Sequence, residues 1–265
     1  MTRPAALWLL ALLVLSGCKK AAPPPPETPT KITVAVAASM RHAFEEIAAA
    51  FESAHPGIDV EATYGASGGF YAQIVQQAPF SLFLSADTEY PRQLVAGGRA
   101  VADFPYAVGR LVLWAPKSAG LDVGTRGLEA LRDPRVQKVA IANPTTAPYG
   151  RAAIATLQKH GLEAEIRARL AHAENVGQAA QFVQSGAAQI GLFALSLTTV
   201  PEMKDDGDAW LVPDTDHEPL EQSGVILPGA GDPAAAEKLR DFLLGPVGRA
   251  ILERHGFSPP PPTVP

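Results

Sequence analysis

The sequence has few of the residues that build most metal and redox sites. Its 265 residues include one cysteine, Cys18, so the chain can form neither an internal disulfide nor a cysteine-rich zinc or iron–sulfur site. The six histidines show no HExxH motif or other paired spacing typical of metal ligands. The residues therefore indicate no metal centre held directly by protein ligands.

Strong charge and long apolar runs are also scarce. Acidic residues (27) slightly outnumber Lys and Arg (22), which gives a formal net charge of −5, and the basic residues do not cluster in the body of the chain. Nucleic acid is therefore excluded as the main partner, because neutralising phosphates requires clustered Lys and Arg. A hydrophobic fraction of 47% is typical of a soluble globular protein, at a length where two-lobed arrangements become common.

The N-terminus has the pattern of an export signal. Arg3 precedes an apolar run over residues 5–15, which is too short to span a bilayer comfortably and ends in small residues before Cys18. The ending Leu-Ser-Gly-Cys resembles a bacterial lipobox, in which the cysteine is lipidated. We predict a lipoprotein signal peptide over residues 1–17, a lipid anchor on Cys18 and an extracytoplasmic location, in the periplasm or at the cell surface.

Two proline-rich segments flank the body of the chain. Residues 18–30 predict a semi-rigid tether, and residues 259–265 predict a disordered tail. Between them the hydrophobic period alternates between that of a strand and that of a helix. Strands are predicted over residues 31–37, 58–64, 80–84, 111–115, 139–142, 189–195 and 224–227. Single helices between strands predict an α/β fold with mainly parallel sheets.

Four junctions between a strand and a helix share one chemistry. They are rich in small residues and contain no acid placed to contact a ligand, and Ser39 and Ser67 are positioned to cap the following helices. Helix N-termini present unpaired N–H groups and a partial positive charge, so several converging on one point predict an anion site. A tetrahedral dianion has no proton to donate and needs only donors. The junctions are residues 37–40, 64–69, 142–150 and 174–176.

The junction sequences resemble the periplasmic molybdate-binding proteins of ABC importers. The runs that carry the resemblance include AVAASM, YGASGGFYAQI, NPTTAPYG and ENVGQA, and the similarity extends from about Lys31 to Phe257. It implies a two-lobed periplasmic-binding-protein fold of type II, each lobe a mainly parallel sheet flanked by helices. The implied lobe 1 covers residues 31–107 plus 225–258, and lobe 2 covers residues 108–224, with hinge segments near residues 106–111 and 222–225.

The resemblance also implies which residues bind molybdate or tungstate. Ser39 and Ser67 match hydroxyl donors, Ala147 and Val176 match positions whose backbone N–H groups face the ligand, and Tyr149 matches the tyrosine of the APYG motif. The implied protein is a monomer without catalytic residues or cofactor. Its implied partners are an ABC permease and the ATPase of that permease.

Two positions depart from the family pattern. Ala194 stands where some members have a tyrosine that contacts the ligand, and Met40 stands where the more similar branch often has an aromatic residue. These departures leave the number of ligand contacts open.

Two other functions are compatible with the residues. Ser39 or Ser67 could serve an extracytoplasmic hydrolase, with His42 three residues after Ser39, although neither serine lies in a G-x-S-x-G motif. The chain could also be a binding protein or sensor for another tetrahedral oxyanion such as sulfate, which sequence separates poorly from molybdate.

Three charged residues near the junctions have simpler interpretations. We expect Arg41 and Arg151 to lie on solvated helix faces, from which they could add long-range attraction for an anion. We expect Asp87 to fix a turn or an interlobe hydrogen bond, because a carboxylate would repel a dianion at close range.

Overall fold

The computed structural model describes residues 29–229 and 231–262. Cys18, the predicted signal peptide and most of the predicted tether lie outside these residues, as does the end of the predicted tail. Among the described residues, no helix combines the length and the apolar character needed to cross a bilayer.

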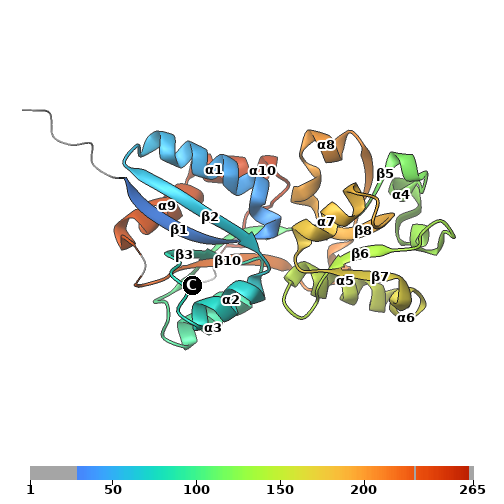
Figure 1. Cartoon of the computed structure of the whole chain (residues 1–265), viewed down its shortest axis with the longest axis horizontal. Coiled ribbons are helices and arrows are strands. Elements are labelled where there is room, and N and C mark those ends of the chain that lie inside the picture. Colours follow the sequence, from blue (N-terminus) through green and yellow to red (C-terminus); the bar gives the residue numbers. More distant parts are fainter. Residues whose placement is uncertain (1–28, 230, 263–265) are drawn as a thin grey trace, which may run out of the picture.

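In the part of the chain that the structure describes, ten strands form two five-stranded sheets, one in each of two lobes (Figure 1). The strands are Thr30–Ala37 (β1), Ile58–Gly65 (β2), Leu82–Leu84 (β3), Asp103–Gly109 (β4), Leu111–Pro116 (β5), Val139–Ala142 (β6), Leu170–Ala173 (β7), Ile190–Ala194 (β8), Gly207–Leu211 (β9) and Leu220–Ile226 (β10). The strand orders are β2-β1-β3-β10-β4 and β7-β6-β8-β5-β9. In each sheet the first three strands are parallel and the fourth is antiparallel to both neighbours. The predicted two-lobed α/β fold is confirmed.

Helices cover both faces of each sheet. The α-helices are Arg41–Ala54 (α1), Ser67–Val75 (α2), Glu89–Ala96 (α3), Val123–Arg126 (α4), Pro148–Lys159 (α5), Glu163–Ile166 (α6), Val176–Gln184 (α7), Pro201–Lys204 (α8), Pro233–Leu244 (α9) and Pro246–Arg254 (α10). Short 3₁₀ turns are Ala38–Met40 (η1), Lys117–Ala119 (η2), Gly127–Arg132 (η3), Arg167–Arg169 (η4), Leu195–Thr198 (η5) and Asp214–Asp216 (η6). In the first lobe α1, α9 and α10 lie on one face of the sheet, and α2 and α3 lie on the other (Figure 1).

Strand β1 shows why its sequence is almost continuously apolar. Val34 and Val36 pack in the cluster that contains Phe44 of α1, whereas Ala35 packs in the cluster that contains Phe70 of α2. Successive side chains of a strand point to opposite faces, so a strand covered on both faces needs apolar residues at every position. The strand ends therefore hold the following loops at a well-defined place between the helix layers.

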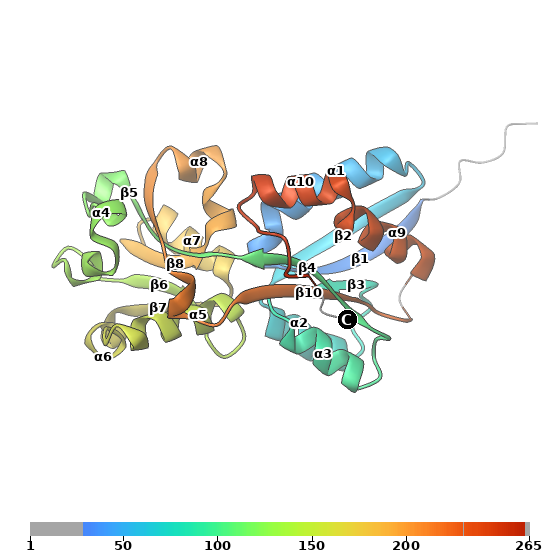
Figure 2. The ribbon, with the colours of Figure 1, turned by 180° about the vertical axis from the view of Figure 1, so that it is seen from behind.

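Two chain segments connect the lobes side by side (Figure 2). Arg110 alone separates β4 of the first sheet from β5 of the second, and the chain returns between β9 and β10. The two connections are held together where Leu220 pairs with Gly109 and where the N–H of Val212 donates to the carbonyl oxygen of Leu111 at 3.0 Å. Together they form a two-stranded hinge.

The points where the chain passes from one sheet to the other differ from the predicted lobe boundaries. All of β10 and the end of β4 belong to the first sheet, whereas the predicted second lobe ran over residues 108–224. The difference arises because β10 begins at Leu220, earlier than the predicted strand over residues 224–227, and because β4 was not predicted.

The strands that the sequence failed to predict, β4, β7 and β9, all lie at sheet edges. An edge strand is only partly buried, so its hydrophobic pattern is weak, and β4 even contains Pro105, which edge positions tolerate. The buried central strands were predicted because their apolar runs are unbroken. Helix α3, which begins with an acidic turn, was also missed.

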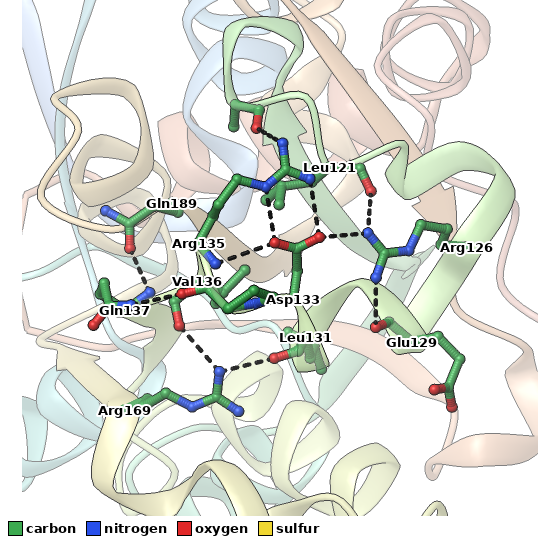
Figure 3. A network of polar contacts seen from close by, with 12 residues as sticks. Leu121, Arg126, Glu129, Leu131, Asp133, Arg135, Val136, Gln137, Arg169 and Gln189 are labelled. Atoms are coloured by element: carbon green, nitrogen blue, oxygen red, sulfur yellow. Dashed lines mark hydrogen bonds and ion pairs between the residues drawn. The ribbon is translucent and has the colours of Figure 1, made fainter.

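A buried carboxylate organises the connection between β5 and β6 (Figure 3). Asp133 accepts hydrogen bonds from the guanidinium of Arg135 at 2.8 and 2.9 Å and from Nη1 of Arg126 at 2.7 Å. Arg169 donates to the carbonyl oxygens of Leu131 and Val136 on either side of it. The hydrogen bonds from Arg135, followed by those from Arg126, hold the pKa of Asp133 well below its usual range.

Replacing Asp133 by Asn is expected to lower the free energy of unfolding at pH 7, because both arginines lose their charged partner. A carboxyl with a lowered folded pKa stabilises the protein above its unfolded pKa of about 3.9, and this stabilisation is lost as the pH falls toward the folded value. The difference between Asp133→Asn and the parent should therefore shrink between about pH 4 and pH 2. Urea unfolding at several pH values checks this.

Glu253→Gln serves as the control, because Glu253 is exposed and makes no ion pair with a described residue. A difference for Asp133→Asn that stays constant down to pH 2, or that is no larger than for Glu253→Gln, would contradict the role assigned to the network.

Candidate functional site

A small cavity lies between the lobes, where the carboxyl ends of parallel strands in the two sheets face each other. Its volume is about 10 Å³, and its wall is built from the starts of η1, α2, α5 and α7. All five residues predicted to bind the ligand line it. The lining residues are Ala37, Ala38, Ser39, Gly65, Ala66, Ser67, Ala86, Ala147, Pro148, Tyr149 and Val176.

The cavity wall is uncharged and made of small residues. Among the described residues, no side chain of Asp, Glu, Lys, Arg or His lines it. Sites for drug-sized organic ligands are typically about 300–1,000 Å³. This cavity is far smaller and has room for about one water-sized probe, so it excludes organic ligands, and even a small ion needs the lobes to move apart to enter.

The two serines do not cap helices, which corrects the sequence interpretation. Helix α2 has Ala66 at its N-cap and α1 has Met40, and neither cap involves a side chain. The Oγ of Ser39 is buried without a hydrogen-bond partner among the described residues. The Oγ of Ser67 accepts a hydrogen bond from the N–H of Ala86 at 3.0 Å, so its own proton stays available. Both hydroxyls are thus free to donate into the cavity.

Two backbone N–H groups add to these donors. The N–H groups of Ser67 and Val176, each the first residue of its helix, have no acceptor within the described part of the chain. The side chain of Asn175 caps α7 by accepting from the N–H of Gln178 at 3.0 Å. The N–H of Val176, a residue that lines the cavity, takes no part in this cap. The positive ends of two helices therefore meet at one point.

Ala147 differs from the role implied by the family resemblance. Its N–H donates to the carbonyl oxygen of Asn143 at 2.9 Å, so in this arrangement the group is already engaged. Ala147 is the N-cap of α5, and Pro148 occupies the first helical position. Ala147 contributes its small side chain to the wall.

Tyr149 brings a buried phenol from the second lobe to the hinge. It is 1% exposed, and its Oη lies 3.3 Å from the Nε2 of Gln222 on β10. Burial raises the pKa of Tyr149, and the hydrogen bond from Gln222 lowers it by less, so the phenol keeps its proton. Tyr149 can therefore act as a neutral donor.

The two departures from the family pattern lie away from the cavity. Met40 is fully buried in the core of the first lobe beside α1, and Ala194 is fully buried at the end of β8. Neither residue lines the cavity.

Several contacts close the lobes around the cavity. The N–H of Gly68 donates to the carbonyl oxygen of Thr146 at 2.9 Å, and the hydroxyl of Ser196 donates to the backbone carbonyl oxygen of Ser39 at 2.6 Å. A Cβ on Gly68 would lie 2.9 Å from the Thr146 oxygen, so this close approach requires glycine. These contacts join residues far apart in the chain, and no local motif predicted them.

An ion pair adds to this closure. Arg151 on α5 donates to Asp87 at 2.6 Å, and Asp87 is also bound by the hydroxyl of Ser85. The predicted interlobe role of Asp87 is confirmed. The side chain of Arg151 is 37% exposed, so it does lie on a partly solvated helix face, from which it also reaches Asp87 of the other lobe. Arg41 does lie on a helix face, stacked on Tyr64 with 4.2 Å between the guanidinium carbon and the ring centroid.

The described residues provide no nucleophile paired with a base at the cavity. His42 makes no hydrogen bond to Ser39 Oγ, and its Nδ1 lies 3.9 Å from Glu45. Ser67 Oγ contacts a backbone N–H instead of a base. The arrangement favours binding over the hydrolase alternative.

The sequence matches the protein-family model described as bacterial extracellular solute-binding protein over residues 32–258. The chain belongs to this family. The family description places its members outside the cytoplasm, in agreement with the predicted location.

Curated relatives are similar over most of the chain. The chain is 39% identical over 230 residues to the molybdate-binding protein ModA of Azotobacter vinelandii, covering 86% of this chain and 90% of that protein. It is 38% identical over 234 residues to the molybdate-binding protein ModA of Rhodobacter capsulatus, covering 88% and 90%. These relatives are named as binding proteins and not as enzymes.

Solved structures share the fold. The periplasmic molybdate-binding protein of Azotobacter vinelandii matches with a TM-score of 0.81 and 34% identity, covering 87% of this chain and all of that one. The sulfate-binding protein SubI of Mycobacterium tuberculosis matches with a TM-score of 0.70 at 15% identity, covering 88% of each chain, which is a likeness of fold alone.

Tyr149 is expected to stay protonated far into the alkaline range because its phenol is buried. Replacing it by Phe should leave the phenolate absorbance that develops up to about pH 11 in the folded protein unchanged. In denaturant, the same variant should lose the absorbance of one of the five tyrosines. Spectrophotometric titration with circular dichroism as a check on folding measures both. A loss equal to one tyrosine in the folded protein would show that the phenol is accessible.

Proposed function

We propose that this chain captures molybdate in the cavity between its lobes and delivers it to the permease of an ABC importer. The observation that carries the proposal is a buried cavity lined by donors from both lobes and by no acceptor side chain of Asp or Glu. The names of the relatives at 38% and 39% identity point to the same ligand.

The donors fit an oxyanion that carries no proton. Hydroxyls of Ser39, Ser67 and Tyr149 and N–H groups at the starts of α2 and α7 can each donate to an oxygen. The partial positive charges of the helix N-termini offset the negative charge without a Lys or Arg in the wall. A hydrogen phosphate ion would need an acceptor for its proton, which this wall does not offer from a carboxylate.

Tungstate fits the same argument, because it is also a tetrahedral dianion, and we propose it as a second ligand. Sulfate is the alternative that the donor set alone does not distinguish. The two classes differ in size, so the selectivity of this site is proposed to rest on how closely the lobes can approach.

Capture is proposed to proceed by closure of the lobes about the two hinge connections. In an open form the anion would bind to the donors of one lobe. Closure would then bring the donors of the other lobe to the anion and exclude water. The Gly68–Thr146 and Ser196–Ser39 contacts and the Arg151–Asp87 pair would then hold the closed form.

The proposed location and partners rest on the sequence and the family. A lipid on Cys18 would anchor the protein to a membrane, and the proline-rich tether over residues 18–30 would hold the body off its surface. We propose that the body acts as a monomer without catalytic activity, and that the closed form docks on a permease served by a cytoplasmic ATPase.

The test is anion binding by the purified protein, measured by calorimetry and thermal unfolding at constant ionic strength. Molybdate at about one hundred times its Kd should stabilise the protein by about 2.7 kcal/mol, which raises the Tm by a few degrees. Tungstate should behave similarly, and phosphate should produce no shift. A shift with sulfate alone would favour the sulfate alternative, and no shift with any of these anions would refute the proposal.

Ser39→Ala should weaken molybdate binding by about 10- to 100-fold, because it removes a hydrogen bond to a charged ligand. Ser185→Ala is the matched control, because Ser185 is an exposed serine at the end of α7. Equal affinities of the two variants would remove Ser39 from the proposed site.

Closure gives a separate prediction at Gly68. In Gly68→Ala the new methyl group would lie 2.5 Å from the Tyr90 hydroxyl of the same lobe, a side-chain end that can turn aside, and 2.9 Å from the Thr146 backbone oxygen of the other lobe. The contact with Thr146 exists only when the lobes are closed, so molybdate affinity should fall by at least about tenfold. Gly69→Ala is the control, because a Cβ there would have nothing within 4 Å. Both variants should keep the Tm of the parent without ligand to within a few degrees. Calorimetry that finds parent affinity in Gly68→Ala would contradict the closed arrangement.

A further inference from the structure

Three buried polar side chains connect the hinge with the cavity. Tyr106 on β4 lies with its Oη 2.9 Å from the Oε1 of Gln222 on β10, and the Nε2 of Gln222 lies 3.3 Å from the Oη of Tyr149. Each residue is at most 2% exposed. Of the three, Tyr149 alone lines the cavity, so Tyr106 and Gln222 can influence a ligand there only through it.

The hinge strands are shaped to let this chain of side chains form. A Cβ on Gly109 of β4 would lie 2.0 Å from the Oη of Tyr149 and 2.7 Å from the Nε2 of Gln222. On the neighbouring strand, the register of β10 shifts between Gln222 and Ser223. Such an irregularity re-aims a side chain relative to a regular ladder. The phenol of the second lobe thus reaches an amide of the first.

The amide of Gln222 determines which way the Tyr149 proton points. A phenol has one proton, and an amide presents either an N–H donor or an oxygen acceptor to it. With Nε2 toward Tyr149, the phenol oxygen accepts and its proton is left for the cavity. With the amide oxygen toward Tyr149, the phenol would donate its proton to Gln222 and would have none left for a ligand.

The groups around Gln222 support the first orientation when an anion is bound. Tyr106 can donate its proton to the Oε1 of Gln222, which leaves Nε2 for Tyr149. The carbonyl oxygen of Ser85, 2.8 Å from the same phenol, is the other acceptor for that proton. Burial raises the pKa values of Tyr106 and Tyr149, so both phenols stay neutral donors. An anion in the cavity offers acceptors only, and therefore favours the Tyr149 proton pointing inward.

We infer that Gln222 is a positioning residue that commits the Tyr149 hydroxyl to donate to the oxyanion. The inference rests on the proposed function, because it assigns a role to Gln222 in binding molybdate. It adds a residue that never touches the ligand to the determinants of affinity. It also explains why an amide, and not an apolar residue, is buried at this point of β10.

A double-mutant cycle with molybdate tests the inference by calorimetry. Tyr149→Phe and Gln222→Met should each weaken binding by about 10- to 100-fold, the range expected for a hydrogen bond to a charged group. If Gln222 acts through Tyr149, the double variant should bind within about twofold of Tyr149→Phe. Equal losses from Gln222→Met in the presence and absence of the Tyr149 hydroxyl would overturn the inference, as would parent affinity in Gln222→Met.

Gln222→Glu tests the polarity with nearly the same volume. At pH 8 an ionised carboxylate there can only accept hydrogen bonds. It would accept one from the Tyr149 hydroxyl, whose proton would then no longer face the cavity, and it would add negative charge nearby. Binding should be weaker than in Gln222→Met, and parent affinity in Gln222→Glu would overturn the inference. Circular dichroism and the Tm without ligand confirm that each variant is folded. If the parent itself binds no molybdate, the proposed function fails; if the parent binds and the cycle is additive, only the role of Gln222 fails.

Discussion

The structure depends on one constraint, which is that a buried, uncharged cavity must present hydrogen-bond donors with their protons free. A hydroxyl is both a donor and an acceptor. For its proton to serve a ligand, the protein must supply a separate donor to the hydroxyl oxygen. The N–H of Ala86 does this for Ser67, and Gln222 does it for Tyr149. The hydroxyl oxygen of Ser39 has no such donor among the described residues. Ser67 follows β2, Ala86 follows β3 and Gln222 lies on β10, so these hydrogen bonds bring three strands of the first sheet to one cavity.

Full charges are kept outside this cavity and are used between the lobes. Arg151 is neutralised by Asp87 across the lobes. The imidazole of His255 lies 3.0 Å from Glu46 of its own lobe and 3.2 Å from the hydroxyl of Thr199 in the other lobe. These groups hold the lobes together at the periphery, where part of each side chain still contacts water. In the wall itself, the helix termini supply a partial charge that costs less to bury than an unpaired ion. Charged side chains at the periphery therefore hold the lobes closed, and uncharged donors in the cavity wall are left to bind the ligand.

The sequence predicts the fold to the extent that burial leaves a pattern in it. The central strands β1, β6 and β8 are apolar at nearly every position because helices cover both faces, and their junctions with helices were found for that reason. The edge strands β4, β7 and β9 were missed because their buried positions do not alternate regularly, whereas the edge strand β2 was found because its positions do. The five predicted site residues do line one cavity, but the serine caps were wrong, since the hydroxyls have tertiary instead of local roles. Gln222 was missed as a partner of Tyr149 because 73 residues separate the two and no local motif relates them.

The strand exchange at the hinge makes the two lobes unequal during synthesis. Every strand of the second sheet lies between Leu111 and Leu211, so that sheet can be completed from one continuous stretch of chain. The first sheet needs β10, which follows the whole second lobe, and until it arrives β4 has no partner strand within that sheet. Pairings between distant segments form slowly because the intervening loop must close first. The first lobe is therefore the last part of the molecule to become complete, although its first four strands are made before the second lobe.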